Sequence, residues 1–226
     1  MKLKNRSITL IAFIAVFGIN GCSDNTGSTT RPDNFEVAYM SSTEGNDAIG
    51  TLVLDTVKIL IKDIKLNVAN SSVTTNFKTG PYVLFLNLNS HINTIGSGYI
   101  PVGTYDKIQF EIHKLSDNEP IPDPEFSEGG LKFSVIAKGT YNGVRFVYKS
   151  DKSAKQKLSF PKTLIVTETE SNVTLQISPY IWFLDSNNQY MDPNNPNHSE
   201  IDNNIKENIK ASFKAWKDNN KDGIPD

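Results

Sequence analysis

The last nine residues of the chain carry the side chains whose types and spacing are most suited to chemistry. Asp218, Asn220 and Asp222 alternate along this segment, and Asp226 is the final residue. Calcium is coordinated by about six to eight oxygen atoms from a tightly curved stretch of chain. Aspartates close together repel one another unless a cation lies between them. The segment therefore predicts a calcium site formed by Asp218, Asn220, Asp222, the backbone carbonyl of Ile224, and Asp226.

The pattern D-x-N-x-D-G-x-x-D at residues 218–226 resembles the start of an EF-hand loop and the aspartate-rich repeats of thrombospondin type. In that resemblance Gly223 makes the sharp turn. The bidentate acid of an EF-hand would lie beyond the last residue of this sequence, which implies weak binding, at about 10⁻⁴–10⁻³ M. The alternative is a polar C-terminus that carries an Asp-Gly turn and no metal.

The sole cysteine of the chain, Cys22, lies directly after an N-terminal segment of the export type. This segment has three basic residues, then an apolar stretch over residues 8–17, then small residues. About ten apolar residues are too few to cross a hydrocarbon core of ~30 Å, so a transmembrane anchor is the weaker alternative. The run from Ile19 to Cys22 resembles the lipobox of bacterial lipoproteins.

The lipobox resemblance implies a signal peptide over residues 1–21 and a lipid attached to Cys22. Ser23, which follows, implies the outer membrane of the bacterial cell envelope and leaves the membrane face open. Two or more acyl chains are expected, because a single chain anchors a protein only marginally. Residues 23–34 contain no large apolar side chain, so residues 22–34 are expected to form a flexible tether.

The charge of the mature chain limits its partners. Without residues 1–21 the chain has 20 basic and 25 acidic side chains, a net charge of −5. Nucleic acid is not an expected partner, because binding its phosphates requires a basic face. Since no second cysteine is present, the chain cannot form an intrachain disulfide, and its stability must come from its core and from any bound metal.

Residues 35–190 show the two-residue periodicity that is typical of β-strands. Within residues 51–68, one apolar alternation runs over 57–61 and a second over 64–68; a helix is the competing interpretation. Further strands are expected at residues 82–88, 106–113, 132–138, 144–149, 164–167, 173–177 and 181–184. Asn142-Gly143 predicts a type I′ hairpin between two of them. Together these elements predict an all-β fold, a single antiparallel β-sandwich of about eight strands.

The run from Pro101 to Tyr105 resembles the Pro-x-Gly-x-Tyr turn found in many envelope β-sandwich modules, including transthyretin-like domains. This resemblance implies an immunoglobulin-like or transthyretin-like sandwich, and it does not imply any activity. In such a turn the glycine permits the bend. The ring of Tyr105 is expected to be buried while its hydroxyl finds a backbone partner.

Residues 115–130 form a second acid-rich segment. Three prolines at alternate positions, 120, 122 and 124, cannot continue a central strand. Five acidic residues lie among them, Asp117, Glu119, Asp123, Glu125 and Glu128. The segment is expected to be a solvated connection between strands, and an acidic lip beside a binding face is the sharper alternative.

The spacing of the apolar residues changes in the segment 191–226. Ile201, Ile205, Ile209, Phe213 and Trp216 recur every three or four residues, which predicts one apolar face of an amphipathic helix. Ser199 is expected to cap this helix, with Asp202 completing a capping box. We expect the face to pack on the core; the alternative is that it docks a partner protein.

No catalytic residue can be assigned from the sequence. His91, His113 and His198 are scattered, and His113 is expected to lie at the surface of its strand. No nucleophile elbow, phosphate loop or dinucleotide fingerprint is found. The leading hypothesis is a non-enzymatic binding or scaffolding module, lipid-anchored and stabilised by calcium, with an unidentified protein or glycan as ligand. The alternatives are an assembly component that docks through its C-terminal helix, and a hydrolase acting on glycans.

Overall fold

The computed structural model describes residues 31–46, 50–195 and 199–226, and the chain is predominantly β. Cys22, the signal segment and most of the expected tether lie outside these residues. The only described α-helix is α1 (Ser199–Ala211), and no helix in the described ranges is long and apolar enough to cross a membrane. The strands are β1 (Phe35–Ser41), β2 (Leu52–Val68), β3 (Thr74–Lys78), β4 (Tyr82–Phe85), β5 (Asn93–Gly98), β6 (Gly103–Ile112), β7 (Ser127–Glu128), β8 (Leu131–Lys132), β9 (Val135–Tyr141), β10 (Val144–Ser150), β11 (Ala154–Val166), β12 (Ser171–Ile177) and β13 (Phe213–Lys217).

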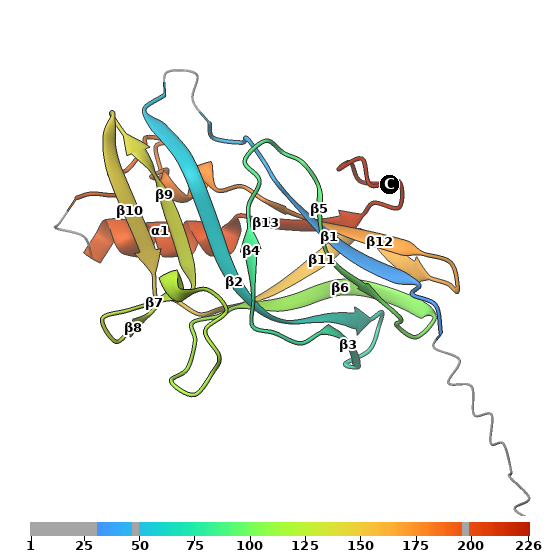
Figure 1. Ribbon diagram of the computed structural model, residues 1–226. Helices are drawn as coiled ribbons and strands as arrows, with labels where there is room; N and C mark the ends of the chain where they lie inside the picture. Colours follow the sequence, from blue (N-terminus) through green and yellow to red (C-terminus); the bar gives the residue numbers. More distant parts are fainter. Residues whose placement is uncertain (1–30, 47–49, 196–198) are drawn as a thin grey trace, which may run out of the picture. The chain divides into compact units, whose positions relative to one another are not determined.

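Two main sheets organise residues 31–226 (Figure 1). Sheet A has the strand order β13-β12-β1-β5. Sheet B has the order β10-β9-β2-β6-β11, and β3 and β4 also pair with β2. Neither sheet closes on itself, and all described pairs but one are antiparallel. The exception is β1, which runs parallel to β12 from Phe35 opposite Ser171 onward, so the expectation of a purely antiparallel fold was wrong.

The long strand β2 explains the two apolar alternations in its sequence. Ile59 and Ile61 point into the core, and Ile64 does so again after an interval of three residues instead of two. The change of phase falls at Asp63, whose backbone has a left-handed φ of 53°. The pairing of β2 with β6 shifts register at the same place, as expected of a β-bulge. The strand interpretation of residues 51–68 is thus confirmed, and the helical one is wrong.

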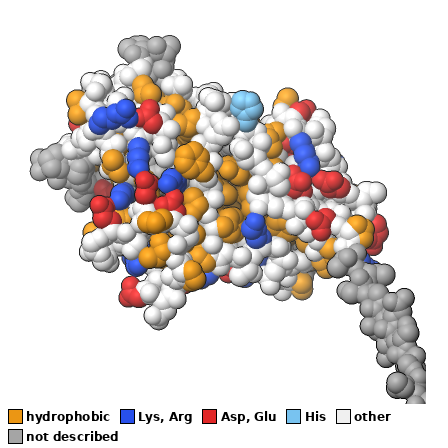
Figure 2. All heavy atoms as spheres, viewed as in Figure 1, with side chains coloured by type: hydrophobic (Ala, Val, Ile, Leu, Met, Phe, Trp, Pro, Cys, Tyr) orange, Lys and Arg blue, Asp and Glu red, His pale blue; other side chains and the backbone are white. Residues whose placement is uncertain are grey.

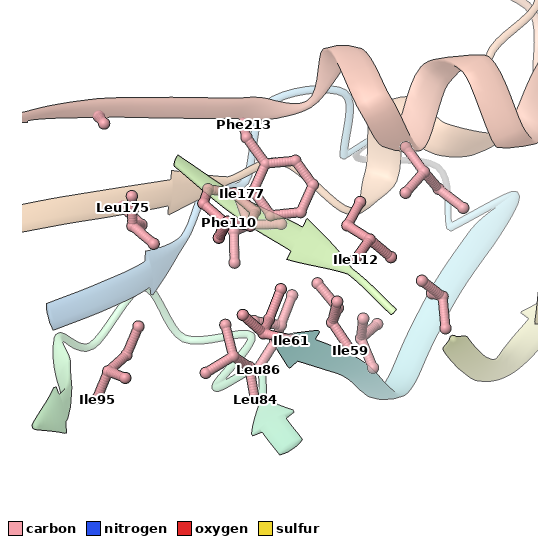
Figure 3. Packing of buried hydrophobic residues seen from close by; sticks show 14 of the residues in the cluster. Ile59, Ile61, Leu84, Leu86, Ile95, Phe110, Ile112, Leu175, Ile177 and Phe213 are labelled. Carbon is pink, nitrogen blue, oxygen red and sulfur yellow. The ribbon is translucent and has the colours of Figure 1, made fainter. Parts of the chain in front are cut away.

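The main hydrophobic core is built from side chains of both sheets and of α1 (Figure 3). Phe110 of sheet B meets Phe213 of sheet A with their ring centroids 5.2 Å apart. Ile205 and Ile209 of α1 belong to the same core and are almost fully buried. The core-packing prediction for this helix is therefore confirmed. The side chain of Ser199, the expected cap, lies outside the described residues.

Two local predictions made from turn residues are confirmed. Asn142 and Gly143 join β9 to β10 with φ values of 47° and 78°, the positive angles that a type I′ turn requires. The ring of Tyr105 is buried, and its hydroxyl donates to the carbonyl of Pro101 at 2.8 Å. In both places a few adjacent residues determine the backbone, so a local pattern is sufficient.

Two other predictions are wrong. The strand expected at residues 181–184 is a 3₁₀-helix, η2 (Tyr180–Phe183), in which Trp182 is fully buried. The helical stripe ends with α1, because Phe213 and Trp216 lie in strand β13, which pairs with β12. In a strand Phe213 and Trp216 face opposite sides, and only Phe213 joins the main core.

Candidate functional site

The C-terminal loop, residues 218–226, folds back from β13 over the outer face of sheet A. Gly223 has a left-handed φ of 80° and lies against Met40 of β1 and Ile92. A Cβ atom at this position would lie 3.0 Å from the Met40 sulfur, so the positive φ and the tight contact both favour glycine. The loop is therefore packed against the sheet rather than frayed.

Asp218 is the buried anchor of the C-terminal loop and is 0% exposed. Its Oδ1 accepts the Asp222 amide N–H at 3.0 Å. Its Oδ2 accepts the hydroxyl of Thr174 at 2.7 Å and the Gly223 amide N–H at 3.0 Å. These donors stabilise the carboxylate without a cation, and Oδ1, which accepts one bond, retains a free lone pair.

Asn220 and Asp222 lie beyond Asp218 at the exposed tip of the loop. Asp222 Oδ1 accepts the Ile224 amide N–H at 2.8 Å, and its Oδ2 accepts the Asn220 side-chain amide at 2.8 Å. The structure thus brings three of the expected ligand residues into one network. Each oxygen of Asp222 keeps capacity for a second partner.

Asp226 closes the loop instead of facing its centre. Its amide donates to the Lys217 carbonyl at 3.1 Å, and its Oδ2 accepts the Asn219 amide N–H at 2.9 Å. The same oxygen lies 3.4 Å from Nζ of Lys217. The backbone bond to Asn219, together with Lys217, lowers the pKa of this carboxyl. Asp226 therefore stays negatively charged and ties the end of the loop to its beginning.

The lysine within the C-terminal loop forms its ion pairs with acids outside the loop. Lys221 pairs with Glu36 and Glu170, at 2.9 Å in each case. In the described ranges neither Asp218 nor Asp222 forms an ion pair with a lysine or arginine. Across the same residues, no three His, Cys, Asp or Glu side chains are placed so that they could hold a metal ion. A cation here would need the amide of Asn220 and a backbone carbonyl as well.

Thr174 and Asn172 of β12 support the loop, and the sequence did not point to them. The side-chain amide of Asn172 donates to the Asp218 carbonyl at 2.8 Å, and the Asn172 backbone N–H donates to the side-chain oxygen of Asn219. Both residues are almost fully buried on the outer face of sheet A. They lie more than 40 positions from the loop and reach it only through the pairing of β12 with β13. No local signal could have identified them.

Neither a family model, nor a curated protein sequence, nor a solved structure matches this chain.

The second acid-rich segment, residues 115–130, is neither a simple solvated connection nor an open acidic lip. It contains the 3₁₀-helix η1 (Pro124–Phe126) and continues through the short β7–β8 hairpin. Phe126 and Leu115 are buried against Leu60 and Ile136 on the outer face of sheet B, in a second small core. Leu60 alternates along β2 with Ile59 and Ile61, which point into the main core, and it is buried because this segment covers it.

Lysines on sheet B hold the acids of residues 115–130. Asp123 lies 2.6 Å from Lys58, and Glu125 lies 2.6 Å from Lys138. Glu119 lies 2.6 Å from Lys62. Figure 2 shows acidic and basic side chains next to one another on the face that includes this segment. The bond to the lysine is in each case the main reason that the pKa of Asp123, Glu125 or Glu119 lies below its usual range.

His113 does not lie at the surface as expected, because it is 8% exposed. Its Nε2 lies 2.7 Å from Glu119, and its Nδ1 lies 3.5 Å from Glu111. The imidazole thus ties the beginning of the 115–130 segment to the end of β6. Its side chain is covered by the segment that follows it, a long-range effect that the strand periodicity could not show.

Proposed function

We propose that this chain is a non-enzymatic binding or scaffolding module of the bacterial cell envelope, anchored by a lipid on Cys22. Its two sheets form a β-sandwich of the immunoglobulin-like or transthyretin-like kind. Its C-terminal loop binds calcium, which locks the loop onto sheet A. The Ile19–Cys22 motif supports the anchor, and the shared core between two antiparallel-rich sheets supports the sandwich.

The calcium proposal depends on one observation, the absence of a basic partner for two aspartates among the described residues. Asp218 and Asp222 share a hydrogen bond through the Asp222 amide, and neither pairs with a lysine. Of the five acids in residues 115–130, by contrast, Glu119, Asp123, Glu125 and Glu128 each have a lysine at 2.6 Å, and only Asp117 has no ion pair among the described residues. Two neighbouring carboxylates that lack a basic partner favour a divalent cation between them, because hydrogen bonds from neutral donors leave their negative charge in place.

The residues that would hold calcium are Asp218, Asn220, Asp222, the Ile224 carbonyl and Asp226. Asp218 and Asp222 would supply the negative charge, and Asn220 and Ile224 neutral oxygens. Asp226 would act from beside Lys217, whose charge opposes a direct bond to the cation. Calcium would therefore bind weakly and stabilise the folded loop by mass action.

Calorimetric titration of the chain from Arg31 to Asp226 with calcium tests the proposal. We expect one weak site, with a Kd of about 10⁻⁴–10⁻³ M. The Asp222→Ala variant should lose the heat of binding and still fold, because Asp222 is exposed. Lys221→Ala, in the same loop, is the matched control and should retain binding. Absence of heat and of any rise in melting temperature at saturating calcium would refute the site.

The lipid anchor is tested separately by mass spectrometry of the protein purified from bacterial membranes. The expected product begins at Cys22 and carries the mass of a diacylglyceryl group. An unmodified cysteine, or a chain that retains residues 1–21, would refute the anchor and leave the calcium site unaffected. The docking alternative has no support, since the apolar face of α1 is buried in the core.

A further inference from the structure

A groove of about 610 Å³ lies where the edges of the two sheets meet the C-terminal loop. One wall is β11 around Leu158 and Pro161, and the other is β13 from Phe213 to Trp216. Ile224 of the C-terminal loop, 64% exposed, forms part of the rim. The groove thus combines apolar walls with an opening to solvent.

The strands that form its walls are both edge strands. β11 is the last strand of sheet B and β13 the last of sheet A. They run close to each other without pairing (Figure 1). β11 also departs from its partner β6 between Ser159 and Leu164, where the register shifts. Edge strands present unpaired N–H and C=O groups, which an added extended segment can satisfy.

Trp216, which lines the groove, carries a buried donor. Trp216 is 6% exposed, and its indole N–H has no hydrogen-bond partner among the described residues. Buried donors are nearly always paired in native proteins, so an unpaired one requires an explanation. A ligand in the groove that carries an acceptor oxygen would supply the missing partner.

The charge of the groove favours an acidic ligand. Of the described residues that line it, two are lysines, Lys157 and Lys214, and none is acidic. Lys157 is exposed. Among the residues that the structure describes, Lys214 pairs only with Glu44, at 3.3 Å, and both side chains are more than half exposed. An exposed pair of this kind contributes little stability and can be exchanged for a new partner.

We propose that this groove binds an extended, acidic peptide segment of a partner protein, which adds to the free edge of β11 or β13. Its backbone pairs with the edge, its carboxylates meet Lys157 and Lys214, and an acceptor oxygen takes the Trp216 N–H. The proposal extends the binding role inferred above by naming the chemistry of the partner. It does not require calcium, although the C-terminal loop supplies part of the rim.

Fluorescence anisotropy with two labelled peptides tests this proposal on the full chain in detergent. The probe is a blocked heptapeptide that alternates valine with glutamate, and the comparison peptide alternates valine with lysine. We expect saturable binding of the acidic peptide only. Trp216→Phe should weaken it about fivefold, the effect of one neutral hydrogen bond. Lys157→Ala should weaken it about threefold, as for an exposed charge pair.

Lys114→Ala is the matched control, because this exposed lysine lies outside the groove, and binding should be unchanged. If Trp216→Phe does not fold, Lys157→Glu, at an exposed position, supplies the test and should abolish binding. Equal binding of both peptides, no saturation at millimolar peptide, or unchanged binding in the groove variants would overturn the proposal. So would dimerisation of the free chain that the groove variants abolish, since the occupant would then be a second copy.

Repeating the titration with calcium and with a chelator separates this proposal from the calcium site. Tighter binding in calcium supports both, because an ordered C-terminal loop completes the rim. Equal binding in the two conditions supports the groove alone. Loss of acidic-peptide binding in both conditions refutes the groove, whatever the calorimetric result for the metal.

Discussion

The two acid-rich segments of this chain, residues 115–130 and the C-terminal loop, compensate their negative charge in opposite ways. The first places Asp123, Glu125 and Glu119 beside lysines of sheet B. The second surrounds Asp218 with N–H and O–H donors and directs Lys221 elsewhere. A lysine partner balances the negative charge of a carboxylate, whereas hydrogen bonds from neutral N–H and O–H donors leave that charge in place. Similar composition therefore gives a closed structural contact in one segment and a candidate cation site in the other.

The largest expected effect is on the apolar contact of the 115–130 segment. Phe126→Ala empties a fully buried position in the second small core and should cost about 3–5 kcal/mol of unfolding free energy. Urea unfolding followed by circular dichroism measures it. The exposed Ile121, in the same segment, provides the control Ile121→Ala, which should be near neutral. A small loss for Phe126→Ala would mean that ion pairs alone hold the segment.

Asp218→Ala should have the next largest effect, on the order of 2–4 kcal/mol, because it leaves the buried Thr174 hydroxyl and the amides of Asp222 and Gly223 without their acceptor. The same unfolding experiment without calcium measures it. Asp222→Ala removes an exposed carboxylate and should change stability much less. If the two substitutions were equally mild, the buried network around Asp218 would not anchor the loop.

Lys58→Met removes the shared partner of Asp123 and Glu125 and should cost about 1–2 kcal/mol at neutral pH. Because the folded pKa of Asp123 is lowered, chiefly by Lys58, its contribution is present above the unfolded pKa of about 4. The contribution is lost as the pH falls through the folded value. Urea midpoints between about pH 6 and pH 3 should therefore fall less in the variant than in the wild type. If the urea midpoints of the variant and the wild type fell equally with pH, the pairing would not be stabilising.

The smallest effect is expected for Glu128→Gln. Its carboxylate pairs with Lys149 at 2.6 Å, but the side chain is 71% exposed, so water and salt screen the interaction. The melting temperature should not change measurably at physiological salt. A clear loss would show that even the exposed rim of this segment contributes, which would sharpen the contrast with the C-terminal loop.

Sequence reasoning identified the features that a few adjacent residues determine. Asn142-Gly143, the turn that ends at Tyr105 and the alternation in residues 51–68 all predicted what the structure shows. Features that depend on distant contacts were missed. Strand β13 is a strand because it pairs with β12, although its residues continue a helical spacing. Likewise, Thr174 and Asn172 reach Asp218 only through that pairing.

Hydrogen exchange of both acid-rich segments, with and without calcium, tests the central claim most directly. The amides of Asp222 and Gly223 bond to Asp218, and the amide of Glu125 bonds to Asp123. With calcium at ten times its Kd, we predict that the first two exchange about tenfold more slowly, while Glu125 does not change. The account would be contradicted if the amides of both segments slowed equally, or if neither segment exchanged more slowly at millimolar calcium.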